Sequence, residues 1–124
     1  MKNPNSAFLI LRLGFALVFV WFASSQLQNP EAWTGFLPAF IDKLPISAVA
    51  FVKINALYEI ISAALLILGV WVRPVALFLA VHLFGIAFTV GFEATGVRDF
   101  GLAIGALALA IGGAGSFSID NRAK

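Results

Sequence analysis

Four ionisable side chains lie inside strongly hydrophobic stretches of this sequence, where an unpaired charge is costly. They are Arg12, Glu59, His82 and Asp99. An ionisable group at membrane depth costs about 2.5–3.5 kcal/mol on insertion scales, so such groups usually face the interior of a helix bundle and find partners there. We therefore expect these side chains to line a polar interior. Each is a candidate for binding a ligand or exchanging a proton.

Asn55 joins this set because of its spacing. Asn55, Glu59 and Ser62 recur at intervals of four and three positions, which places them on one face of a helix. Glu59 and Arg12 carry opposite charges at similar expected depths, so we predict that they pair. Two interpretations of the pair stay open. It is either a buried ion pair that fixes helix register, or a polar pocket for a proton, a quinone head group or a small solute.

His82 and Asp99 each have a purely structural alternative. A single histidine in a helix often hydrogen-bonds a neighbouring backbone group, and His82 follows a run of apolar residues. Asp99 stands at the predicted start of a helix, where a carboxylate stabilises the positive end of the helix dipole. We find no nucleophile–base pair and no metal-ligand cluster in the sequence. The residues therefore favour neither a self-contained enzyme nor a metal site, and a subunit role in an oxidoreductase complex stays open.

The composition shows which elements must position these residues. The chain has 124 residues, of which 61% are hydrophobic and 11% are charged, and its mean hydropathy is +1.00. Average proteins are about 45–50% apolar and about 25% charged, so a water-soluble monomer is excluded. A membrane-spanning helix needs roughly 20 apolar residues. A chain of this length therefore holds at most about four passes and short loops.

The residue counts exclude several kinds of chemistry. The chain has no cysteine, which excludes disulfides, thiolate chemistry and iron–sulfur clusters. A single histidine cannot supply both axial ligands of a bis-histidine haem. The net charge is only +2, and the basic residues are dispersed, whereas nucleic-acid binding wants them clustered on one face. We therefore expect no nucleic-acid partner.

Four hydrophobic runs predict an all-α fold, an integral membrane four-helix bundle forming a single domain over residues 1–124. The passes are expected at about residues 7–27, 47–72, 74–92 and 99–114. The first run is expected to remain as a helix and not to be a cleaved signal peptide, because Arg12 interrupts it and three further runs follow. Arg73 and Pro74 leave almost no loop between the second and third passes, so these two should form an antiparallel hairpin.

A stripe of small residues on the fourth pass predicts close helix packing, because small side chains let backbones approach. Its members are Gly101, Gly105, Ala108 and Gly112.

Residues 28–46 form the longest connection between predicted passes, and their sequence also contains a pattern typical of a short helix. Asn29, Pro30 and Glu31 are typical of a helix start. Apolar side chains then follow at helical spacing: Trp33, Phe36, Leu37, Phe40 and Ile41. We predict a short amphipathic helix in the membrane interface. The alternative is an ordinary loop with aromatic anchors, because Pro38 interrupts helical hydrogen bonding.

The basic residues predict the orientation of the passes. The side that holds both termini collects Lys2, Arg12, Arg73, Arg122 and Lys124. The other side has Lys43, Lys53 and Arg98. The positive-inside rule therefore places both termini in the cytoplasm, with the chain in the cell membrane.

Several short motifs follow one another in an order that is moderately specific. They are Arg12-Leu13-Gly14, Glu59, Leu66-Ile67-Leu68-Gly69 followed by Arg73, Arg98-Asp99-Phe100-Gly101-Leu102, and Gly113-Ala114-Gly115-Ser116-Phe117-Ser118-Ile119-Asp120. With these motifs the chain resembles, over nearly its whole length, the DoxX family of small four-helix bacterial and archaeal membrane proteins. Members commonly carry a glycine and then a lysine near the end of the first helix. This chain has Ser24, Ser25, Gln26 and Leu27 there, so any role of that lysine does not carry over.

The resemblance implies architecture more firmly than chemistry. Some relatives look like subunits of quinone-linked sulfur oxidation, and others like membrane partners of redox or stress complexes. We predict an accessory or quinone-linked subunit of a membrane redox assembly, whose redox chemistry needs a quinone or a partner's centre. We expect the protein to lie in the lipid bilayer and to have a redox protein or a second copy of this chain as its partner. The alternative is a small oligomeric transporter or channel for a small solute or ion.

Overall fold

Four long helices dominate the computed structural model, which describes residues 4–122 and the side chains of residues 6–121. They are α1 (Pro4–Gln28), α2 (Ala48–Leu68), α3 (Val72–Val90) and α4 (Ala94–Gly112). All four are long and apolar enough to cross a membrane. No strand occurs among the described residues, so the prediction of an all-α fold with four membrane-spanning helices is confirmed.

The fourth helix begins five residues earlier than predicted, at Ala94. A tight turn brings this about. Gly91 has a φ of 86°, a left-handed conformation that glycine adopts readily, and the Glu93 amide donates to the Gly91 carbonyl at 2.9 Å. The chain therefore reverses within a few residues and enters α4 at once. Asp99 consequently lies inside the helix, and the interpretation of Asp99 as its N-terminal cap is wrong.

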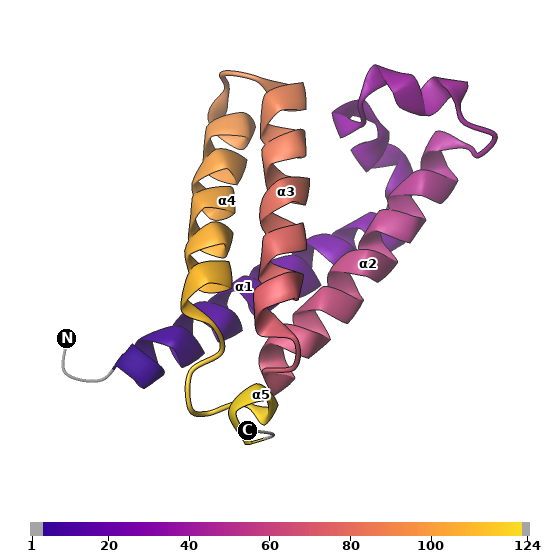
Figure 1. The fold of residues 1–124 in the computed structure, drawn as a ribbon. Helices are drawn as coiled ribbons and strands as arrows, with labels where there is room; N and C mark the ends of the chain where they lie inside the picture. Colours follow the sequence, from indigo (N-terminus) through magenta and orange to yellow (C-terminus); the bar gives the residue numbers. More distant parts are fainter. Residues whose placement is uncertain (1–3, 123–124) are drawn as a thin grey trace.

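The long helices pair as two antiparallel hairpins. α1 packs along α2, and α3 packs along α4 (Figure 1). The short turn between α2 and α3 predicted that these two helices form an antiparallel hairpin, but they meet mainly near their turn and diverge above it in Figure 1. The apolar core lies where the hairpins meet and includes Phe15, Phe19, Leu66, Leu79, Leu83 and Leu109. The divergence leaves room between the hairpins at the other end.

A C-terminal segment, residues 113–122, folds back over the turn between α2 and α3 (Figure 1). It contains the short helix α5 (Ile119–Arg122). The Asp120 carboxylate accepts hydrogen bonds from the amides of Trp71 at 2.8 Å and Val72 at 2.9 Å, which are unpaired donors at the start of α3. The Asp120 amide donates to the Gly69 carbonyl at 2.9 Å. The segment therefore caps α3 and ties it to the end of α2.

Two short 3₁₀ helices, η1 (Pro30–Phe36) and η2 (Ala39–Lys43), lie at the opposite end of the molecule, next to α1 and α2 (Figure 1). The predicted amphipathic α-helix is therefore wrong in its geometry. Pro38 is extended, with φ −62° and ψ 151°, and it lacks the amide that would continue a helix. Trp33 packs edge-on against Phe22 of α1, with ring centroids 5.6 Å apart. The location of η1 and η2 at the membrane interface stays a prediction.

Candidate functional site

A cavity of about 410 Å³ lies between the two hairpins, beneath η1 and η2. Its volume falls within the range of about 300–1,000 Å³ that is usual for small-molecule pockets. Apolar side chains from all four long helices form most of its walls. Its polar lining includes Gln26 of α1, Asn55 and Glu59 of α2, His82 of α3, and Arg98 and Asp99 of α4. Apolar walls with a few convergent polar groups are typical of a ligand site.

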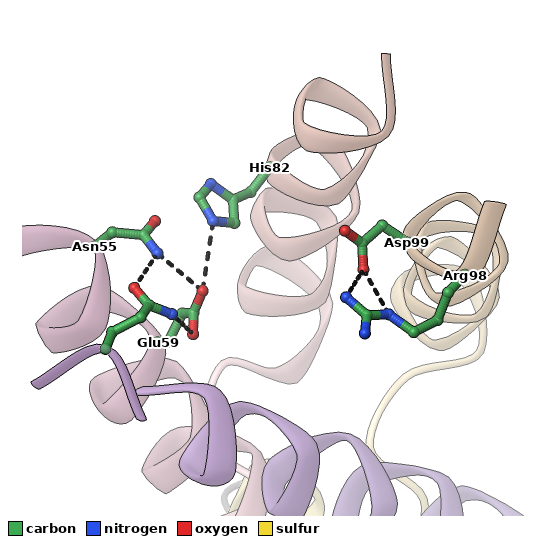
Figure 2. A network of polar contacts seen from close by, with 6 residues as sticks. Asn55, Glu59, His82, Arg98 and Asp99 are labelled. Atoms are coloured by element: carbon green, nitrogen blue, oxygen red, sulfur yellow. Dashed lines mark hydrogen bonds and ion pairs between the residues drawn. The ribbon is translucent and has the colours of Figure 1, made fainter. Parts of the chain in front are cut away.

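Three of these polar side chains form a closed hydrogen-bonded ring. The Gln26 Nε2 donates to Glu59 Oε2 at 3.1 Å. The Asn55 Nδ2 donates to Glu59 Oε1 at 3.0 Å and to Gln26 Oε1 at 2.9 Å. Both carboxyl oxygens of Glu59 thus accept a hydrogen bond, and both hydrogens of the Asn55 amide are used. We call Gln26, Asn55, Glu59 and His82 the polar cluster (Figure 2).

His82 is the member of the polar cluster whose hydrogen bonding is incomplete. Its Nε2 lies 3.7 Å from Glu59 Oε1, which is too long for a hydrogen bond. This nitrogen is buried and has no hydrogen-bond partner among the described residues. Figure 2 shows the imidazole reaching from α3 toward Glu59. A buried polar atom left unsatisfied costs about 1–3 kcal/mol, so a bound hydrogen-bonding ligand would be stabilised here.

Arg98 and Asp99 form a second polar group in the cavity wall (Figure 2). The Arg98 Nε and Nη2 donate to Asp99 Oδ1 at 3.2 and 3.1 Å. The Arg98 guanidinium also lies over the ring of Phe22 on α1, 4.9 Å from its centroid, where a cation–π contact is favourable. Asp99 therefore orients an arginine that connects α4 to α1, and it does not bond to the polar cluster.

Arg12 lies far from this cavity, so the predicted Arg12–Glu59 pair is wrong. Its fully buried guanidinium donates to the carbonyls of Leu66 at 2.6 Å, of Ile67 at 3.4 Å and of Phe117 at 2.5 Å. The carbonyls of Leu66 and Ile67 lie in the last turn of α2. Backbone carbonyls there have no amide partner within the helix, and the helix dipole favours a cation. Glu59 is seven residues earlier, about 10 Å along the helix at 1.5 Å per residue. Arg12 therefore binds the C-terminal end of α2, whereas Glu59 lies near the middle of this helix.

Gln26 is the site residue that the sequence interpretation missed. It is buried and holds Glu59, although it attracted notice only as a departure from the family pattern. Its position contained a usable signal. The buried residues Arg12, Phe19 and Ala23 lead to Gln26 in successive steps of seven, four and three positions, so Gln26 continues their face of α1.

The small-residue stripe on α4 divides between two environments. A Cβ on Gly105 would lie 2.8 Å from Phe15 Cζ, and one on Gly112 would lie 2.6 Å from Phe8 Cε1. These two glycines therefore admit α1 side chains. Gly101 and Ala108 are exposed, because α4 packs on α3 through a different face that includes Asp99, Ala103, Ala106 and Leu109. The stripe is not one continuous contact surface.

A comparison with family models matches the DoxX model to residues 7–91. The chain belongs to the DoxX family. The matched part contains all four members of the polar cluster and ends before Arg98 and Asp99. Comparisons with curated proteins and with solved structures give no match.

Most of the motifs behind the DoxX resemblance meet at the end of the molecule opposite the cavity. Arg12 bonds to Leu66 and Phe117 there, and Arg73 Nη1 donates to the Ile111 carbonyl at 3.0 Å. A Cβ on Gly69 would collide with Ser118 of the C-terminal segment. The DoxX motifs at this end therefore hold the helix ends together, whereas Glu59 belongs to the cavity.

Proposed function

We propose that this DoxX-family membrane protein binds a quinone in its cavity and acts as an accessory subunit of a membrane redox assembly. The observation that carries the proposal is His82 Nε2, which lies in the wall of a largely apolar cavity and has no hydrogen-bond partner among the described residues. A quinone combines an apolar ring and tail with oxygens that accept hydrogen bonds. The imidazole N–H of His82 is a matching donor when the proton is on Nε2.

The other side chains support this fit. Phe19, Phe51 and Leu83 line the cavity and offer apolar contact to a ring. Glu59 lies 3.7 Å from the imidazole and is itself held in place by the side-chain amides of Gln26 and Asn55. A bound quinone supplies two-electron, two-proton redox chemistry. The chain would hold and orient the quinone oxygen at His82 Nε2, while a partner protein exchanges the electrons.

The proposed function is tested by what copurifies from the native membrane. Tagged wild-type protein should bring down a stoichiometric isoprenoid quinone, measured by mass spectrometry of the lipid extract, together with a redox protein. The His82→Phe variant should lose the quinone and keep the protein partner. A homo-oligomer without quinone that passes a small solute across proteoliposomes would contradict the proposal and support the transporter alternative.

We also propose that the chain lies in the cytoplasmic membrane with both termini in the cytoplasm. The distribution of lysine and arginine supports this orientation, although Lys2 and Lys124 lie outside the described residues. The Arg12–Phe117 bond is consistent with both termini on one side. Reporter fusions after Asp42 and after Lys124 test the orientation, and a periplasmic signal from the C-terminal fusion would contradict it.

A further inference from the structure

The cavity has an exposed border along one edge of α3. Val81, Gly85 and Thr89 line the cavity and are also exposed at the surface, Val81 to 62%. Their spacing of four residues places them in one row along the helix. Val81 is the middle residue of α3 (Val72–Val90), so this border lies within the membrane-spanning part of the chain. A ligand that passes it comes from the hydrocarbon region.

Contacts between different elements cross the other sides of the cavity. The Arg98 guanidinium bridges from Asp99 to the ring of Phe22 and so connects α4 with α1. Aromatic side chains line the end toward η1 and η2, where Trp33 packs on Phe36 with ring centroids 5.5 Å apart. A water-soluble solute would have to separate these apolar contacts.

We infer that the cavity opens laterally to the lipid between α2 and α3, through a portal bordered by Val81, Gly85 and Thr89. Its ligand is an amphiphile dissolved in the bilayer, which enters sideways and places a hydrogen-bonding head group against His82. α2 and α3 diverge above their turn (Figure 1), and the cavity-lining residues Val81, Gly85 and Thr89 of α3 are exposed. This inference rests on the proposed function, because the portal matters only if the cavity binds a ligand.

Gly85 offers a direct test of the portal. A Cβ at Gly85 meets nothing within 4 Å, so Gly85→Leu narrows the portal without displacing a neighbour. Gly101→Leu is the matched control, because Gly101 is also an exposed helical glycine with open space around it and does not line the cavity. Thermal melting in detergent should confirm that both variants are folded like the wild type.

The measurement is stopped-flow quenching of Trp33 fluorescence by decylubiquinone in lipid nanodiscs. The exposed Trp21 and Trp71 are replaced by phenylalanine, which leaves only the tryptophan that lines the cavity. Gly85→Leu should slow association and dissociation by about tenfold each and leave Kd nearly unchanged, because a gate affects both rates equally. Gly101→Leu should behave as wild type. Adding lipid at constant decylubiquinone should slow association in proportion to the falling mole fraction in the bilayer.

The possible failures are distinguishable. If the wild-type protein shows no saturable quenching, the proposed function fails and the portal fails with it. If saturable quenching occurs but Gly85→Leu keeps the wild-type association rate, the portal alone is wrong. An increase in Kd that comes only from faster dissociation would mean that leucine fills the cavity, and this also overturns the portal.

Discussion

Arg12 ties α1 to the end of α2 and to the C-terminal segment, so its replacement should destabilise the whole bundle. We consider Arg12→Met, which keeps an unbranched apolar side chain and removes the donors. The bonds to Leu66 and Phe117 are short, and a hydrogen bond to a charged group contributes about 1.5–3 kcal/mol. Losing both should therefore lower the free energy of unfolding by about 3–6 kcal/mol. Equilibrium unfolding in mixed micelles, followed by circular dichroism, measures this loss.

Two controls separate the bonds of Arg12 from its charge. Arg73→Met removes an exposed arginine with one bond to a carbonyl and should cost much less. Arg12→Lys should fall between wild type and Arg12→Met, because a single ammonium cannot reproduce the planar fork of the guanidinium. A loss below about 1 kcal/mol for Arg12→Met would refute the reasoning, because it is less than one such bond contributes.

The same variants test whether Arg12 and Glu59 act independently. The losses of Arg12→Met and Glu59→Gln should add to within about 0.5 kcal/mol in the double variant, as expected for sites without shared partners. Recovery of stability in the double variant would show that the two charges meet.

Two further substitutions test individual contacts. Gly105→Leu should lower the melting temperature because its side chain must displace Phe15, whereas Gly101→Leu should not; equal melting curves would contradict this. Asp120→Ala removes the acceptor for the Val72 amide and should cost about 0.5–2 kcal/mol, as the loss of a helix cap does; unchanged stability would show that the C-terminal segment does not cap α3.

Composition and hydropathy alone predicted the four membrane-spanning helices, because the length of a pass is fixed by the thickness of the bilayer. The register between helices could not be predicted in the same way. The sequence predicts similar depths in the membrane for Arg12 and Glu59, but it does not predict how the helices tilt. The hairpins diverge, so Arg12 reaches the end of α2, where unpaired carbonyls compete successfully for a guanidinium.

The sequence predicted several of the buried polar residues, but it predicted which of them share a face only within one helix. The spacing of Asn55 and Glu59 placed them on one face of α2, and the structure brings His82 to that face from α3. Gln26 came from a third helix, and nothing in the local sequence around it pointed to Glu59. The packing of the aromatic side chains of η1 could also not be predicted from the sequence. Pro38 interrupts the helical spacing on which the prediction of an amphipathic helix depended.

The most direct test of the account is the effect of His82→Phe on quinone affinity and on stability in the same preparation. Because the buried Nε2 has no hydrogen-bond partner among the described residues, an apolar ring of similar shape should leave the melting temperature unchanged or raise it. The affinity for decylubiquinone, measured by Trp33 quenching in nanodiscs, should fall by about tenfold or more, as expected when a hydrogen bond of about 1.4 kcal/mol is lost. Wild-type affinity in a stably folded His82→Phe variant would contradict the claim that His82 binds the head group.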